Sequence, residues 1–103
     1  MIILKSSREI ELMRQAGKIT AAARALAGAM VAPGVTTREI DRAVARYIRS
    51  QGAVPSFLHY NGYPASVCIS VNDEVIHGIP GSRVLKEGDI VSVDVGAFKD
   101  GFH

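Results

Sequence analysis

An aspartate inside an apolar run is the strongest single candidate for chemistry in this sequence. Residues 90–97 alternate so that the valines share one face, while Ser92 and Asp94 share the other, which predicts a strand. An ionised carboxylate in such a strand is costly unless a cation meets it. Carboxylates suit divalent metals, but a usable site needs several converging ligands. An aspartate that hydrogen-bonds within an edge strand or faces water remains the alternative.

A turn follows this predicted strand. Lys99-Asp100-Gly101 predicts a tight hairpin, because Asp-Gly suits the positive φ angles that such a turn requires. The returning strand would then hold only Phe102 and His103. We therefore expect the sequence to break off inside a hairpin.

His77 is the second candidate, because it precedes the rigid segment Gly78-Ile79-Pro80. The glycine allows close approach to the backbone, and the proline stiffens the loop. A histidine held in this way suits a hydrogen bond to a substrate amide. The alternative is a structural or exposed turn histidine. For His59, which lies among aromatic residues, we expect packing or surface exposure.

Three aromatic residues and the single cysteine could line an apolar pocket: Phe57, Tyr60, Tyr63 and Cys68. Rings and a soft thiol would suit a thioether side chain, since sulfur packs well against rings. An ordinary core beneath a loop is the alternative. No nucleophile–base pair, phosphate-binding glycine loop or zinc-type Cys/His spacing is present.

Composition and charge limit the class of protein. The 103 residues, 48% hydrophobic and 21% charged, predict one globular domain with no membrane span. The first residues do not resemble a signal peptide, and one cysteine fits a reducing cytosol, so we expect a cytoplasmic protein. Residues 1–50 carry a net charge of +5 and residues 51–103 one of −3. The basic half is either the solvated side of helices or a contact for an anionic partner such as ribosomal RNA.

Two helices are expected to position these residues. The first runs from about Ser7 to Met30, after a capping box formed by Ser6 and Glu9. Its predicted apolar stripe comprises Ile10, Met13, Gly17, Ala21, Leu26 and Met30. A second capping box, Thr36 with Glu39, opens a helix that ends before Gly52. Its predicted stripe comprises Ile40, Ala43, Val44, Tyr47 and Ile48.

The remainder predicts strands and ordered loops. Residues 55–64 form an irregular loop, residues 67–71 a strand, Asn72-Asp73 a turn and residues 74–77 a short strand. After a turn at 85–89 comes the strand that holds Asp94. This order predicts an α+β fold, in which two helices pack on one face of a mainly antiparallel sheet.

Taken together, several segments resemble the type I methionine aminopeptidases more closely than proline-specific relatives. They lie at residues 11–17 (ELMRQAG), 33–37 (PGVTT), 60–70 (YNGYPASVCIS), 72–80 (NDEVIHGIP) and 88–95 (GDIVSVDV). The resemblance implies a pita-bread fold around two divalent metal ions, and removal of the initiator methionine from nascent proteins. It makes Asp94 a metal ligand and His77 the histidine that contacts the scissile amide. Methionine would be bound by Tyr60, Tyr63, Cys68 and Phe57, the last at a position where other members often carry cysteine.

The same resemblance implies that residues 1–103 are the N-terminal half of such a domain. Of five metal ligands in the family, two Asp, one His and two Glu, only Asp94 is present, and the general-base glutamate is missing. We therefore expect weak or no binding of Co, Mn, Fe or Zn ions, and no activity of this chain alone.

Two alternatives stay open. One is a non-catalytic half-domain that binds the ribosome. The other is a half that complements a separate C-terminal fragment, through the open edge at Lys99–Phe102. The expected substrate is a nascent N-terminus that begins with Met, and we expect no membrane and no specific DNA partner.

Overall fold

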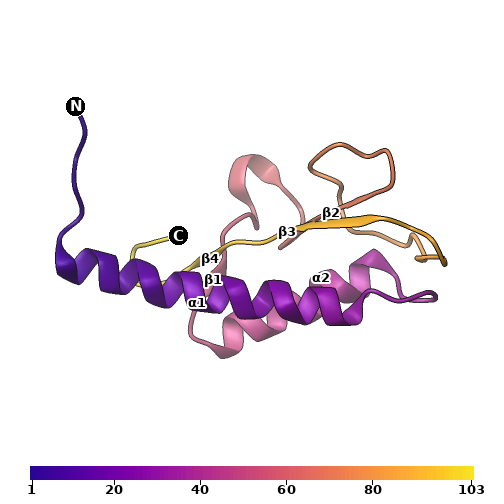
Figure 1. Cartoon of the computed structure of the whole chain (residues 1–103), viewed down its shortest axis with the longest axis horizontal. Helices are drawn as coiled ribbons and strands as arrows, with labels where there is room; N and C mark the ends of the chain where they lie inside the picture. Colours follow the sequence, from indigo (N-terminus) through magenta and orange to yellow (C-terminus); the bar gives the residue numbers. More distant parts are fainter.

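A helical layer and a layer of short strands make up the chain. The computed structural model describes all 103 residues. Helices α1 (Ser7–Met30) and α2 (Thr37–Ser50) lie side by side and antiparallel (Figure 1). The strands are β1 (Val54–Pro55), β2 (Cys68–Val71), β3 (Val91–Asp94) and β4 (Ala97–Phe98), and a short helix η1 spans Tyr60–Gly62. None of these helices has both the length and the apolar content needed to cross a bilayer.

Both helices begin at the predicted caps. Ser6 Oγ accepts the Glu9 N–H at 3.1 Å, and the Glu9 carboxylate accepts the Ser6 N–H at 2.8 Å, which completes a capping box. At α2, Thr36 Oγ1 accepts the Glu39 N–H at 3.2 Å. The Glu39 carboxylate there accepts from the Thr36 hydroxyl instead of its backbone N–H, so the second predicted box is only half formed.

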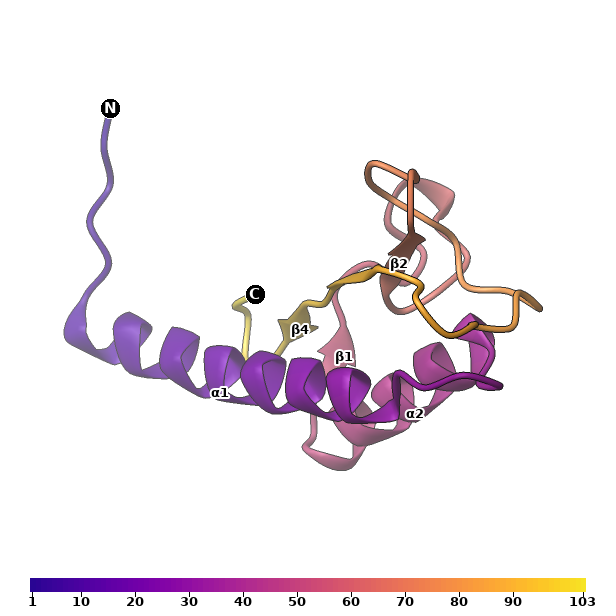
Figure 2. The same cartoon turned by 45° about the vertical axis from the view of Figure 1, so that its right-hand side comes forward.

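The predicted apolar stripe of α1 is wrong in phase over its first four residues, whereas Leu26 and Met30 are half-buried and Met30 packs against the core. Its buried residues are Ala16, Ile19, Ala23 and Ala27. Ile10 and Met13 stay 45% and 37% exposed, because α1 is about 36 Å long and α2 only about 21 Å, so the first turns of α1 extend past α2 (Figure 2). Alanines are buried because they permit close approach of the neighbouring elements. For α2, the predicted Ile40, Val44 and Ile48 are fully buried.

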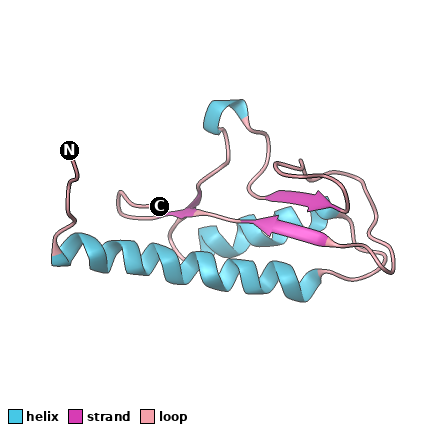
Figure 3. Ribbon diagram, turned by 45° about the horizontal axis from the view of Figure 1, so that its top comes forward, coloured by secondary structure: helices cyan, strands magenta, loops and turns pink.

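The strands form two antiparallel pairs instead of one continuous sheet. β2 pairs with β3, with Cys68 opposite Asp94, and β1 pairs with β4 (Figure 3). Only Val95 and Gly96 separate β3 from β4. Residues 91–98 therefore pair first with β2 and then, after these two residues, with β1. At Gly96 a Cβ would lie 2.9 Å from Ser56 Oγ, so a side chain there would displace its neighbour. The valines of 91–95 pack on the helical core, as the alternation predicts.

The short strand predicted at 74–77 is wrong, because this segment is an exposed loop. Asn72 adopts a positive φ of 56°, and the Glu74 carboxylate accepts the Val71 N–H at 2.8 Å, which turns the chain away from β2. The backbone N–H of Ile69 in β2 bonds to Gly78 instead of to residues 74–77. The Gly78 carbonyl accepts the Ile69 N–H at 2.8 Å.

The hairpin turn near the end of the sequence is confirmed. Lys99 and Phe102 form an antiparallel bridge, and Asp100 and Gly101 have φ values of 51° and 88°.

The molecule as a whole is less compact than a typical monomer of its size. Its accessible surface is 6643 Å² and its radius of gyration 14.7 Å, against about 5,600 Å² and about 13 Å for a compact monomer of this size.

Candidate functional site

A pocket of about 540 Å³ opens on the strand face that lies away from the helices. It takes residues from four separate segments of the chain: residues 57–63, β2, the loop before Pro80, and β3. Its lining residues are Phe57, Tyr60, Asn61, Gly62, Tyr63, Cys68, His77, Ile79 and Asp94. All six residues singled out from the sequence as site candidates are therefore brought together.

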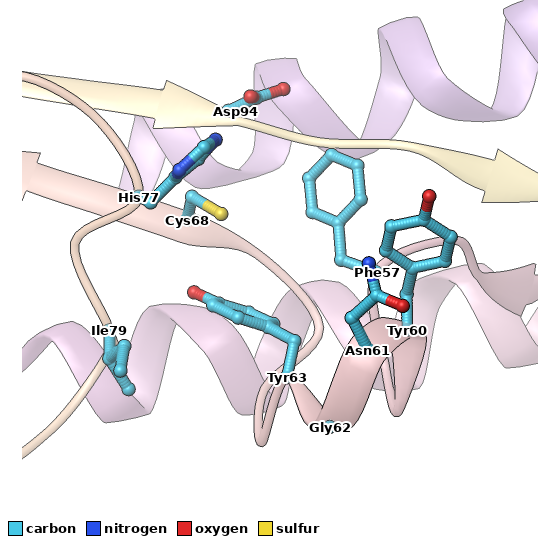
Figure 4. A pocket seen from close by; sticks show the side chains of 9 residues that line it. All are labelled: Phe57, Tyr60, Asn61, Gly62, Tyr63, Cys68, His77, Ile79 and Asp94. Atoms are coloured by element: carbon cyan, nitrogen blue, oxygen red, sulfur yellow. The ribbon is translucent and has the colours of Figure 1, made fainter.

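Polar and apolar groups occupy different parts of this pocket. The carboxylate of Asp94, the imidazole of His77 and the thiol of Cys68 gather at one end, while the rings of Phe57 and Tyr60 stand at the other (Figure 4). Tyr60 is 70% exposed, so its ring forms part of the rim. The arrangement can hold an apolar group between the rings while a polar group faces Asp94 and His77.

The register of β2 and β3 fixes two of these residues. Cys68 lies directly opposite Asp94, and residues so placed share a face, with Cβ atoms about 4.5–5.5 Å apart. Cys68 is only 6% exposed, whereas Asp94 is exposed. The thiol therefore lies at the bottom of the pocket, and the carboxylate is open to a ligand.

Tyr63 joins the aromatic loop to the neighbouring segments. Its hydroxyl donates to the Val67 carbonyl at 2.8 Å and lies 3.3 Å from the Gly78 carbonyl. Burial raises the pKa of Tyr63, and the neighbouring Cys68 and the carboxylates of Asp41 and Asp94 raise this pKa further. The phenol therefore stays a neutral hydrogen-bond donor across the physiological pH range.

His77 is held in an unusual backbone conformation. Its φ is 59°, a region that costs about 1–3 kcal/mol for a residue other than glycine. The next residue secures it, because the Gly78 N–H donates to the buried Ser70 Oγ at 3.0 Å. A Cβ at Gly78 would lie 2.1 Å from the Ile69 carbonyl oxygen, so only glycine fits this position.

The donor set is too small to hold a metal ion by itself. Asp94 is the one carboxylate of the pocket, and nowhere in the chain do three or more His, Cys, Asp or Glu side chains converge as metal ligands would. Divalent ions need several converging donors. The residues of this chain therefore do not fit a dinuclear centre without further ligands.

Three lining residues were not anticipated: Asn61, Gly62 and Ile79. Asn61 and Gly62 adopt positive φ values of 47° and 79°, and they turn the chain between the two tyrosines. The Asn-Gly pair is a recognisable turn signal, but it does not reveal a pocket. His59 is exposed and does not line the pocket, and His103 lies 2.9 Å from Ser56 Oγ, outside it.

Several known proteins with a similar sequence and a similar fold are methionine aminopeptidases. The chain is 52% identical over 103 residues to methionine aminopeptidase 1 of Bacillus subtilis, and 55% identical over 103 residues to methionine aminopeptidase of Clostridium perfringens. These alignments cover 100% of this chain but 42% and 41% of the relatives. The crystal structure of methionine aminopeptidase from Rickettsia prowazekii superposes with a TM-score of 0.93 at 39% identity, over 97% of this chain and 40% of that one.

These similarities confirm the resemblance to methionine aminopeptidases and the α+β class, as part of a pita-bread fold. The chain spans about two-fifths of the length of the curated relatives that it matches. Residues 11–103 match the model of metallopeptidase family M24. The chain belongs to that family.

Proposed function

We propose that this chain forms the substrate-binding part of a methionine aminopeptidase, a metal-dependent hydrolase that removes the N-terminal methionine from nascent proteins. One observation carries the proposal: side chains from four separate segments converge on a single pocket with an apolar end and a polar end. The names of the relatives support the same activity.

In this proposal the apolar end receives the methionine side chain. The rings of Phe57, Tyr60 and Tyr63 offer polarizable surfaces, against which a thioether packs favourably. The sulfur of Cys68 extends this polarizable surface toward the polar end. Because Tyr63 is tied to the Val67 carbonyl, its ring has a fixed position when the substrate enters. Selection of methionine then depends on a preformed cavity.

The polar end would hold the peptide bond. His77 donates a hydrogen bond to the scissile amide, where it stabilises charge that develops on the carbonyl oxygen. Asp94 contributes one carboxylate to a divalent metal centre. Two bound metal ions would activate water and polarise the carbonyl of the scissile bond, and Co, Mn, Fe and Zn are the metals to test.

The isolated chain should be inactive, because a single carboxylate gives neither the affinity nor the geometry of a metal centre. The purified chain would be incubated with a Met-Ala-Ser peptide and Co²⁺ or Mn²⁺, beside the Bacillus subtilis relative. We expect methionine release from the relative only. Clear release by this chain would contradict its inactivity.

A chimera separates the proposed function from this inactivity. The matching segment of the Bacillus subtilis relative, 52% identical, would be replaced by residues 1–103 of this chain. We expect the chimera to release methionine from the same peptide. A folded chimera without activity would contradict the proposed substrate-binding role.

A second candidate function is complementation with a separate polypeptide, and the open edge of β3 favours it. The Ile90 carbonyl accepts from Asn72, so Val91 and Val93 direct their backbone groups away from β2, and no strand pairs with them there. Mixing this chain with the remaining segment of the Bacillus subtilis relative should restore methionine release. Absence of both activity and a stable complex would exclude this candidate.

A further inference from the structure

The solvent face of α2 is unusually basic. Arg38, Arg42, Arg46 and Arg49 fall within an arc of about 80° around the helix. The buried Val44 and Ile48 lie on the opposite side. The arginines therefore form one continuous row along the outside of the molecule.

This row borders a second cavity, of about 500 Å³, which is separate from the pocket described above. Three arginines line one side, and the loop that follows β1 lines the other with Leu58, Pro64 and Ser66. The same loop turns Phe57, Tyr60 and Tyr63 toward the first pocket. One loop thus divides two cavities, and a ligand in this second groove leaves the first pocket open.

The positive charge of the groove has no partner within the chain. The only ion pairs are Arg14–Glu11 and Arg83–Glu74, so none of the arginines of α2 is paired. The single carboxylate of the groove, Asp41, accepts the N–H groups of Ser66 at 2.8 Å and Val67 at 2.9 Å. Its Oδ1 is committed to holding the loop, and three arginines outnumber this one carboxylate, so the groove keeps an excess of cationic donors.

We propose that this arginine groove binds the phosphate backbone of a single-stranded RNA. Guanidinium groups pair with phosphates through two parallel hydrogen bonds and also stack on bases. Arg42, Arg46 and Arg49 span about 10 Å along the helix axis, so together they can contact more than one phosphate of the same strand. Leu58 and Pro64 add an apolar lip for sugars or bases. Phosphate contacts carry no sequence information, so binding should not depend on base sequence.

The shape and charge of the groove favour a nucleic acid strand over a bilayer or an acidic peptide. A bilayer surface is flat and cannot enter a groove of this kind. An acidic peptide offers carboxylates at irregular spacing, whereas a nucleic acid strand offers one phosphate per nucleotide. This proposal does not depend on aminopeptidase activity, since none of the pocket residues takes part in it.

The test is fluorescence polarisation of a labelled twelve-nucleotide RNA of mixed sequence with the full 103-residue chain. The variant R42Q/R46Q/R49Q is compared with R8Q/K18Q/R24Q, which removes the same charge from exposed positions of α1. With about three phosphate contacts, binding should weaken about 20-fold between 50 mM and 200 mM salt. We expect the α2 variant to lose at least about tenfold in affinity, and the α1 variant less than about twofold.

A conservative variant and competing ligands complete the test. R42K/R46K/R49K keeps the charge but loses the paired hydrogen bonds, so we expect an unchanged salt dependence with about two- to fivefold weaker binding. Circular dichroism establishes that each variant is folded. Equal losses in the α1 and α2 variants, no binding at 50 mM salt, or tighter binding of DNA or of a poly-glutamate peptide would each overturn the proposal.

Discussion

The helical layer and the pocket side of this chain are built to different degrees of completeness. α1 and α2 cap their own ends and bury a shared core, in which Ile40, Val44 and Ile48 have no exposed surface. The pocket side gathers its residues from two strands and two irregular segments, and it leaves β3 paired on one edge only. The difference indicates that stability resides in the core between the helices and the strands, whereas the pocket face contributes little packing. Substitutions in the two regions should therefore affect different measurements.

The largest effect should come from the helical core. Ile48→Ala removes a fully buried side chain, so we expect a loss of about 3–4 kcal/mol in the free energy of unfolding. Urea denaturation followed by far-UV circular dichroism measures this loss. Ile90→Ala, at a position that is 73% exposed, should change stability by less than about 0.5 kcal/mol. Similar losses in both variants would show that the core does not lie where we place it.

The next largest effect should come from Asp94 and should leave stability unchanged. Asp94→Asn, made in the chimera, removes the proposed metal carboxylate, and we expect at least a 100-fold loss of methionine release, on the order of that for metal-site residues. The matched control is Asp73→Asn, in an exposed turn outside the pocket. Full activity of Asp94→Asn would contradict the proposed role of Asp94 as a metal ligand.

His77 tests whether the polar end of the pocket acts on the reacting amide. His77→Ala in the chimera should lower kcat by about 100-fold with little change in KM, because the proposed hydrogen bond strengthens as charge develops. His59→Ala is the matched control, since His59 also has a positive φ but is exposed outside the pocket. A rise in KM alone would assign His77 to binding only.

The smallest effect should come from Tyr63, a pocket residue whose hydroxyl also contributes to stability. Tyr63→Phe removes the hydrogen bond to the Val67 carbonyl and should cost about 1 kcal/mol of stability. Because the pKa of Tyr63 is raised in the folded state, its contribution is complete below the ordinary tyrosine pKa of about 10 and is lost as the pH rises above it. The difference between wild type and variant should therefore shrink at high pH.

The sequence predicts the helical layer better than the loops, for physical reasons. Caps and glycines mark helix ends locally, so Ser6, Thr36 and Gly52 place both helices correctly. The prediction missed the buried face of α1, including Ile19, because three of its four buried residues are alanines, and alanine is a weak hydrophobic marker. Ala16 and Ala23 are buried for their small size, which only the approach of a neighbouring element explains.

The candidate site could be predicted only in part. Alternation and a rigid loop single out Asp94 and His77, but nothing local indicates that they share a pocket. Their grouping with the aromatic residues came from the resemblance to a family. Asn61 and Ile79 were missed because loop closure in space, and not periodicity, brings them to the pocket. The roles of these residues stay predictions until the chimera is measured.

The pairing of Cys68 with Asp94 also has a consequence for folding accuracy. If β3 shifted by one residue against β2, its alternate side chains would exchange faces, and the Asp94 carboxylate would enter the layer where the valines meet the helices. Burying that charge without a partner is strongly unfavourable. The residue proposed for chemistry thus also penalises the misaligned strand, and substitution of Asp94 by an apolar residue should make errors in strand alignment more frequent.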